Sequence, residues 1–211
     1  MTVLLVHSPL LGPASWAEVA ARLPQAVVPD LRPALVPPYY ASLSAAACAG
    51  LGGAEDVTVI AHSRAGPLVP SITARLGEAV SVVVYVDARL PHPGRTWLST
   101  VSPPQADHLR TLVEDGRLAP WNTWFAASDD WPDLGEIPRV PWDMLTEPAP
   151  HFALPPIRRR YIQLSSAYVE TADRAAFEGF DVVRLDIGHL GMMTHPDLVT
   201  DLCLENSGHG E

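Results

Sequence analysis

The chain alternates short apolar runs with stretches whose apolar residues have helical spacing. The apolar runs are rich in β-branched residues and predict strands at residues 3–6, 26–28, 57–61, 80–86, 161–164 and 182–185. Helices are predicted between them at residues 16–23, 43–51 and 67–76. Strands that are apolar on both sides and alternate with helices are typical of a mostly parallel sheet with helices on both faces. The pattern therefore predicts an α/β fold.

The stretch from about residue 90 to residue 160 interrupts this alternation. It holds 12 of the 22 prolines and five of the six tryptophans. An insertion of this kind in an α/β fold is typical of a lid over the functional site. Trp121, Trp124 and Phe125 either line an apolar pocket there or attach the insertion to the body. The 211 residues are enough for one sizeable core, so we expect a single domain over residues 1–211 with a lid insertion at about 90–160.

Charge and composition argue against some classes of partner and exclude some kinds of cofactor chemistry. A net charge of −10 argues against nucleic acid and against an anionic membrane surface as partners. All 14 basic residues are arginine, which excludes Schiff-base chemistry and a lysine-anchored pyridoxal cofactor. Cys48 and Cys203 lie far apart and indicate two buried thiols rather than a disulfide or a metal site. We expect a small-molecule substrate, no cofactor and no metal.

The sequence gives only indirect indications of location and origin. The apolar start lacks a basic region and reads as a strand, and no run approaches the length of a membrane span, so a cytoplasmic protein is expected. The lack of lysine, with abundant alanine and proline, is typical of a high-GC bacterium such as an actinomycete and would favour a role in natural-product metabolism. A homodimer is compatible with the sequence, which does not determine the oligomeric state.

The most informative run is Val57 to Gly66, in which a β-branched strand leads directly into Ser63 and then into a predicted helix. A nucleophilic serine on a sharp, strained turn needs small residues two positions before and after it. Ala61 and Ala65 occupy those positions, and Gly66 follows. The run predicts a nucleophile elbow. The alternative is an ordinary serine that caps the N-terminus of a helix.

An activated serine needs a base, and His189 is the best candidate. It comes just after the last predicted strand, where a loop returns over the carboxyl edge of the sheet. His7 is expected to be a structural residue behind the loop after the first strand, and His62 to pack beside the elbow.

Three segments in order resemble the α/β-hydrolase superfamily, and in particular its small plant methylesterase and hydroxynitrile lyase group. They are residues 6–16, which resemble a histidine-glycine loop, the elbow at 61–66, and residues 188–196 around His189. The resemblance covers nearly the full chain. It implies the α/β-hydrolase fold, with Ser63 as nucleophile and His189 as base.

A third residue, an acid that orients the histidine, completes such a triad, and its position in this chain departs from the superfamily pattern. In most of the superfamily it follows the strand that corresponds to residues 161–164, where this chain has Ser165-Ser166-Ala167-Tyr168. Glu170 and Asp173 come slightly late. Asp87, at the end of the strand after the elbow, stands where some superfamily members, including certain haloalkane dehalogenases, keep their acid. We favour Asp87 over Glu170. The alternative is that Asp87 caps the following turn or pairs with Arg89.

The predicted oxyanion hole also departs from the superfamily pattern. One donor is the backbone N–H of Arg64, and the second normally comes from the position occupied here by Pro9, which has no N–H. Either Leu10 supplies the second N–H or the reaction does not need a complete oxyanion hole. The Arg64 side chain either binds an anionic or carbonyl oxygen in the cleft or pairs with a surface acid.

Three functions remain open. The leading hypothesis is a serine hydrolase of a small, rather apolar ester or acyl compound, with Ser63, His189 and Asp87 as its triad. A second is a cyclase, lyase or carbon–carbon bond-forming enzyme of natural-product (polyketide) biosynthesis on the same fold. A third is a non-catalytic small-molecule binding protein. Pro9, Leu10, His62, Arg64, Trp121 and Trp124 are the predicted substrate-contacting residues.

Overall fold

A computed structural model describes residues 1–124 and 131–205. Its central sheet has six strands in the order β2-β1-β3-β4-β7-β8, and every neighbouring pair is parallel. The strands are β1 (Thr2–Val6), β2 (Ala26–Val27), β3 (Val57–His62), β4 (Val80–Val86), β7 (Arg158–Gln163) and β8 (Asp181–Arg184). All six predicted strands are present, and the predicted α/β fold class is confirmed.

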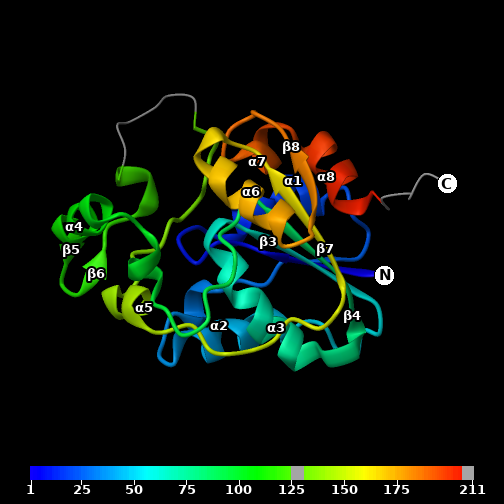
Figure 1. The fold of residues 1–211 in the computed structure, drawn as a ribbon, viewed down its shortest axis with the longest axis horizontal. Helices are drawn as coiled ribbons and strands as arrows, with labels where there is room; N and C mark the ends of the chain where they lie inside the picture. The colour runs from blue at the N-terminus through cyan, green and yellow to red at the C-terminus, as the bar shows by residue number, and fades with distance from the viewer. Residues whose placement is uncertain (125–130, 206–211) are drawn as a thin grey trace.

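Helices cover both faces of the sheet (Figure 1). Helices α2 (Tyr39–Cys48), α3 (Val69–Leu76) and α6 (Val169–Phe177) bury their apolar residues on one face. Helices α1 (Ala17–Ala20), α7 (Gly191–Thr194) and α8 (Pro196–Leu204) pack on the other. Short 3₁₀ helices are η1 (Pro13–Trp16), η2 (Arg32–Ala34), η3 (Ser63–Leu68), η4 (Gly77–Ala79), η5 (Trp97–Thr100), η6 (Trp121–Thr123) and η7 (Ser166–Tyr168).

Helix boundaries differ from the prediction where distant residues stabilise a helix end. Helix α2 begins at Tyr39, four residues before the predicted start. The Glu147 carboxylate accepts hydrogen bonds from the backbone N–H groups of Tyr39 and Tyr40, at 2.8 and 3.0 Å. A carboxylate satisfies the free N–H groups of a first turn and interacts favourably with the helix dipole. This cap comes from more than one hundred residues away, so local patterning cannot reveal it.

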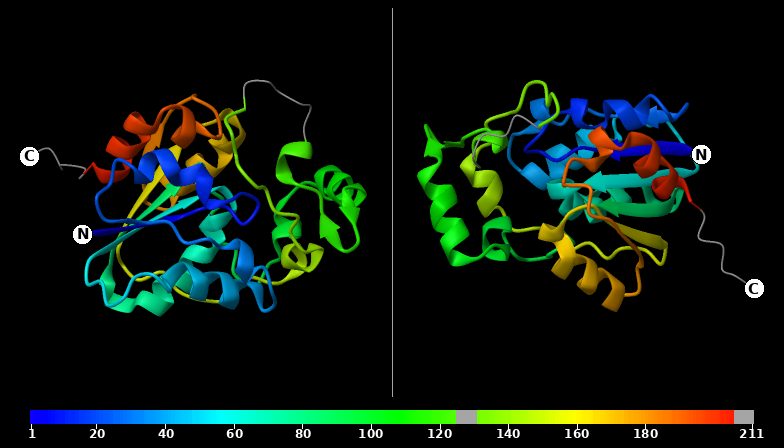
Figure 2. Two further views of the ribbon diagram at one scale, coloured as in Figure 1. Left: turned by 180° about the vertical axis from the view of Figure 1, so that it is seen from behind. Right: turned by 90° about the horizontal axis from the view of Figure 1, so that it is seen from above.

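The stretch predicted as an insertion carries α4 (Pro103–Thr111), the hairpin of β5 (Val113–Glu114) and β6 (Arg117–Leu118), and α5 (Trp142–Thr146). In Figure 1 the strand β1 runs from the N-terminus toward the side where these elements lie, and Figure 2 shows the same arrangement from two other directions. They therefore lie beyond the carboxyl edge of the sheet, where α/β folds hold their ligands. Residues 125–130 of the predicted insertion are outside the described residues. None of the helices that the structure describes is long and apolar enough to span a membrane.

Candidate active site

Ser63 lies on a strained turn between β3 and η3. Its φ of +56° is in the left-handed region, which a residue other than glycine rarely adopts. The flanking Ala61 and Ala65 are small and fully buried. A Cβ on Gly66 would lie 1.9 Å from the carbonyl oxygen of Arg89, so a side chain at that position would require the backbone to shift. This is the geometry of a nucleophile elbow.

Ser63, His189 and Asp87 form a continuous chain of hydrogen bonds. The Ser63 hydroxyl donates to His189 Nε2 over 3.1 Å, and His189 Nδ1–H donates to Asp87 Oδ2 over 2.8 Å. Ser63 and Asp87 follow directly after the neighbouring strands β3 and β4, and His189 reaches them from the loop after β8. Such a chain orients a histidine to take a proton from the serine.

The Asp87 carboxylate is fully buried and held from β7 as well. Its Oδ1 accepts the backbone N–H groups of Leu164 and Ser165 at 2.8 and 3.1 Å, and its Oδ2 accepts the Ser165 hydroxyl at 2.6 Å. Buried polar groups need such partners. Glu170, the other acid considered, is exposed on α6. Asp87 forms no ion pair with Arg89 among the described residues.

The His62 ring packs against the His189 ring, and His62 does not line the cavity next to Ser63 and His189. The two ring centroids are 4.5 Å apart, and His62 Nε2–H donates to the His189 carbonyl oxygen over 3.0 Å. Burial, with a smaller contribution from His189, lowers the pKa of His62 well below its usual value. A neutral His62 therefore supports the backbone that carries His189. Substrate contact by this side chain, one of the sequence predictions, has no support in this position.

The loop after β1 is held by His7. The backbone N–H of Leu31 donates to His7 Nε2 over 3.0 Å, and His7 Nδ1–H donates to the Ser8 carbonyl oxygen over 2.8 Å. Burial lowers the pKa of His7, which favours this neutral form. The Leu10 N–H, the second oxyanion donor considered, donates to Ser8 Oγ at 3.2 Å. The loop therefore presents no second N–H that is free of internal partners at this position.

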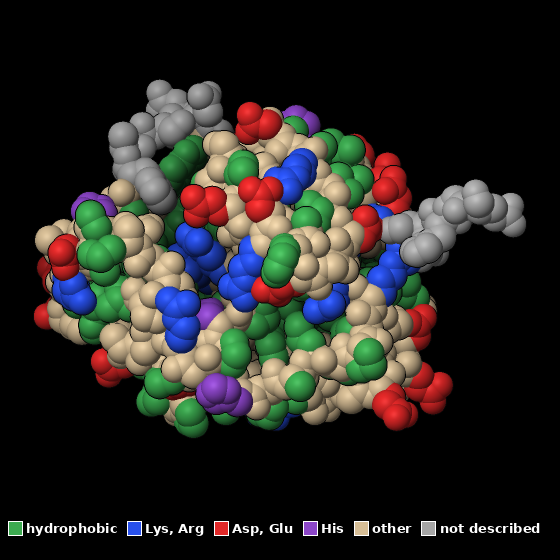
Figure 3. Space-filling model, viewed as in Figure 1, with side chains coloured by type: hydrophobic (Ala, Val, Ile, Leu, Met, Phe, Trp, Pro, Cys, Tyr) green, Lys and Arg blue, Asp and Glu red, His purple; other side chains and the backbone are tan. Residues whose placement is uncertain are grey.

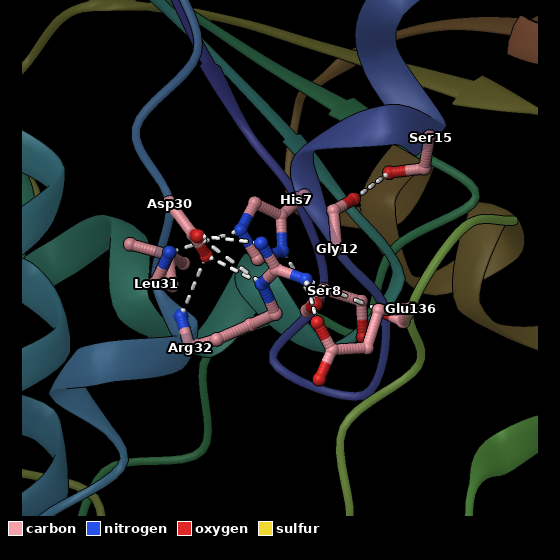
Figure 4. A network of polar contacts seen from close by, with 8 residues as sticks. All are labelled: His7, Ser8, Gly12, Ser15, Asp30, Leu31, Arg32 and Glu136. Atoms are coloured by element: carbon pink, nitrogen blue, oxygen red, sulfur yellow. Dashed lines mark hydrogen bonds and ion pairs between the residues drawn. The ribbon is translucent and has the colours of Figure 1, made fainter.

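Arg32 connects this part of the molecule to the insertion, as Figure 4 shows. Its guanidinium forms a two-point ion pair with Asp30, with contacts of 2.9 and 2.7 Å. It also reaches the Glu136 carboxylate, at 3.3 Å. The segment from Asp30 to Arg32 therefore contacts both His7, through the Leu31 N–H, and the insertion, through Glu136.

A cavity of about 530 Å³ opens above Ser63 and His189. Trp121, Trp124 and Trp131 from the insertion line it together with Tyr168. The Tyr168 ring stacks on the His189 ring with an interplanar angle of 4° and a centroid separation of 5.2 Å. Trp121 and Trp124 line this cavity and also pack against the core. Sequence reasoning missed Tyr168 and Ser165, whose roles depend on the position of β7 beside β4.

Two arginines also line this cavity. The Arg64 guanidinium carbon lies 3.6 Å from the centroid of the Trp97 ring, and that of Arg89 lies 5.2 Å from the Tyr168 ring. Pro9 lies in a smaller chamber beside Arg64, and Leu10 lines both spaces. Basic side chains also gather at the hollow between α6 and the insertion (Figure 3), where Arg89, Arg95 and Arg174 line a further cavity.

Comparison of the sequence finds no matching family model and no matching curated protein. Comparison of the structure finds many similar solved structures. One is an extracellular α/β-hydrolase from a Paenibacillus species, described as sharing structural and functional homology with tobacco salicylic acid binding protein 2. The TM-score is 0.73 at 14% identity, covering 96% of this chain and 97% of that one.

Two other similar structures extend the comparison. A pyrethroid hydrolase from Sphingobium faniae has a TM-score of 0.69 at 19% identity, covering 96% of this chain and 95% of the other. Tomato methylketone synthase I, in a complex with β-ketoheptanoate, has a TM-score of 0.65 at 14% identity, covering 96% of both chains. The similarity extends over nearly the whole of each protein, so this chain has the α/β-hydrolase fold.

Proposed function

We propose that this protein is a serine hydrolase of small, rather apolar esters or related acyl compounds. The observation that carries the proposal is the hydrogen-bond chain from Ser63 through His189 to Asp87, with contacts of 3.1 and 2.8 Å. A wall rich in tryptophan above Ser63 favours an apolar substrate of modest size. The fold shared with an extracellular α/β-hydrolase and a pyrethroid hydrolase is consistent with this chemistry.

The proposed reaction has two stages. Ser63 Oγ attacks the ester carbonyl carbon while His189 Nε2 takes its proton, and the protonated histidine then gives that proton to the departing alcohol. In the second stage His189 Nε2 takes a proton from water while the water oxygen attacks the acyl carbon. The proton then passes to Ser63 Oγ as the bond from Ser63 to the acyl group breaks. Asp87 holds the histidine in the required tautomer, and the Arg64 backbone N–H stabilises the oxyanion.

Intact-protein mass spectrometry after treatment with a fluorophosphonate tests this directly. We expect one covalent addition to the wild type and none to Ser63→Ala or His189→Ala. His108→Ala, which changes an exposed histidine on α4, is the matched control and should label like the wild type. Labelling would be followed by a panel of esters and lactones. The absence of labelling in folded wild type would contradict the proposal.

A second candidate is a non-hydrolytic enzyme of small-molecule biosynthesis. The observation that favours it is the loop after β1, where Pro9 has no N–H and the Leu10 N–H is already bonded to Ser8 Oγ. Removing one oxyanion donor lowers ester hydrolysis by about 10²–10³, whereas a proton relay through Ser63 and His189 has no such need. A product with the mass of its substrate would support this candidate, and a product with one added water would support hydrolysis. Tight binding of a ligand without turnover would indicate a binding protein.

A further inference from the structure

Arg64 occupies an unusual position for a charged side chain, directly after the proposed nucleophile. Its guanidinium stacks on the Trp97 ring, which comes from the insertion. It lines both the cavity above Ser63 and a small adjoining chamber of about 40 Å³. Arg64 therefore stands at the junction of the two spaces.

The charge of this arginine has no carboxylate partner among the described residues. The Nη1 atom of Arg64 and the Nε atom of Arg89 are buried and donate no hydrogen bond to any of the residues that the structure describes. By contrast, ion pairs to carboxylates are made by Arg22, Arg32, Arg110, Arg139, Arg160, Arg174 and Arg184. A chain with a net charge of −10 has ample acidic side chains, yet no carboxylate in residues 1–124 and 131–205 forms an ion pair with Arg64.

A buried cation without a counterion is costly, because burial removes it from water without a compensating charge. Burial lowers the pKa of the Arg64 guanidinium, and the charge of Arg89 acts in the same direction. Two like charges at the wall of one cavity increase this cost. An anion that enters the cavity would relieve it.

The geometry around Arg64 favours a carboxylate. Stacking on Trp97 occupies a face of the guanidinium and leaves its in-plane N–H groups for a planar, two-point acceptor. The chamber of about 40 Å³ has room for a small group such as a carboxylate, since about 10–15 Å³ of this kind of volume is enough for one water. Tyr40 and His92, which also line it, share a hydrogen bond of 3.3 Å with each other. Arg64 is the arginine that lines this chamber.

We propose that the substrate carries a free carboxylate on its acyl side, and that Arg64 binds this group while Ser63 attacks the ester carbonyl. Because Ser63 and Arg64 line the same cavity, one substrate molecule can present its ester carbonyl to the first and its carboxylate to the second. The substrate class is therefore a half-ester of a dicarboxylic acid. Arg89 lines the same cavity, and its positive charge also attracts the carboxylate. The inference rests on the proposed hydrolase activity.

Matched pairs of esters test the substrate class. The 4-nitrophenyl half-esters of succinate, glutarate and adipate are compared with neutral 4-nitrophenyl esters of the same chain length. We expect the wild type to favour the best half-ester by at least about tenfold in kcat/KM, mainly through KM, since hydrogen bonds to charged groups are the stronger class. Arg64→Gln should reduce this preference about tenfold or more, and Arg64→Lys should restore part of it. Arg110→Gln, an exposed arginine on α4, controls for the loss of one positive charge and should keep the preference.

Two measurements keep the test independent of folding and of hydrolysis. Thermal unfolding of Arg64→Gln should occur at or above the wild-type temperature, because the substitution removes a partly buried charge that has no carboxylate partner among the described residues. Calorimetry on Ser63→Ala with glutarate should show binding that is lost in the double variant with Arg64→Gln. Binding without any ester hydrolysis would support the carboxylate site and contradict the proposed function. An equal preference in wild type and Arg64→Gln, no glutarate binding, or equally tight binding of inorganic phosphate would overturn the carboxylate proposal.

Discussion

The Ser165 hydroxyl donates a 2.6 Å hydrogen bond to Asp87 Oδ2, the same oxygen that accepts His189 Nδ1–H. Ser165 follows β7, the strand after which most members of the superfamily that the sequence resembles carry their acid. In this chain the proposed acid, Asp87, comes directly after β4, and the residues after β7 supply donors to it. The carboxylate is thus fixed from two neighbouring strands.

Removing the Ser165 hydroxyl tests this arrangement. Since hydrogen bonds to charged groups contribute about 1.5–3 kcal/mol, and part of this is replaced by the remaining donors, Ser165→Ala should lower kcat about tenfold with a small effect on KM. Steady-state kinetics on a reactive ester measures this. Ser81→Ala is the matched control, because Ser81 donates to the exposed Asp56 carboxylate far from the site. Equal kinetics in wild type and Ser165→Ala would show that the hydroxyl does not position Asp87.

The two acids considered from the sequence can be separated by isosteric amides. Asp87→Asn should lower kcat by about 10³–10⁴, because an amide holds the histidine in the wrong tautomer. Glu170→Gln should have little effect, because Glu170 is exposed on α6. Rates of fluorophosphonate labelling for both variants measure the reactivity of Ser63 without a known substrate. The reverse order of effects would assign the acid to Glu170.

Gly66 is constrained by its contact with the Arg89 carbonyl group. A methyl group at this position would require the backbone after β4 to move, because its carbon would lie 1.9 Å from the oxygen. We expect Gly66→Ala to lower the free energy of unfolding by about 1–3 kcal/mol, as overpacking does, or to prevent folding. Denaturant unfolding measures this. Gly50→Ala is the control, since its Cβ would meet a single side-chain atom of Val27, at 3.2 Å, and the effect there should be smaller.

Buried neutral histidines should make stability depend on pH. Burial lowers the pKa values of His7 and His62 below the ordinary 6.5, so the unfolded chain binds more protons than the folded one once the pH falls below about 6.5. The free energy of unfolding should therefore decrease as the pH is lowered from 7 to 5. Each such histidine contributes up to about 1.4 kcal/mol per pH unit.

His62→Gln isolates one of these groups. The glutamine amide keeps a donor for the His189 carbonyl oxygen but does not titrate. The pH dependence of unfolding should become shallower by up to one proton, which denaturant titrations at several pH values can measure. An unchanged slope would mean that His62 does not remain neutral in the folded protein over this range.

The pattern of apolar and small residues was sufficient to predict the strands of the sheet and the turn at Ser63. Six apolar runs predicted six strands because strands buried on both faces need continuous apolar sequence, and small residues around Ser63 predicted the turn because no larger residues fit there. Helix ends were less predictable. The start of α2 depends on Glu147, which a local window does not include.

Tertiary structure decided which acid meets His189 and what surrounds Arg64. Asp87 and Ser165 lie 78 residues apart in sequence and meet because β4 and β7 are hydrogen-bonded neighbours. The stacking of Arg64 on Trp97 depends on how the insertion folds back over the carboxyl edge of the sheet. Side-chain types and local spacing are properties of the sequence, so it determined the candidate chemistry. Contacts between distant segments depend on strand order and packing, so only the folded chain determines which candidates come together.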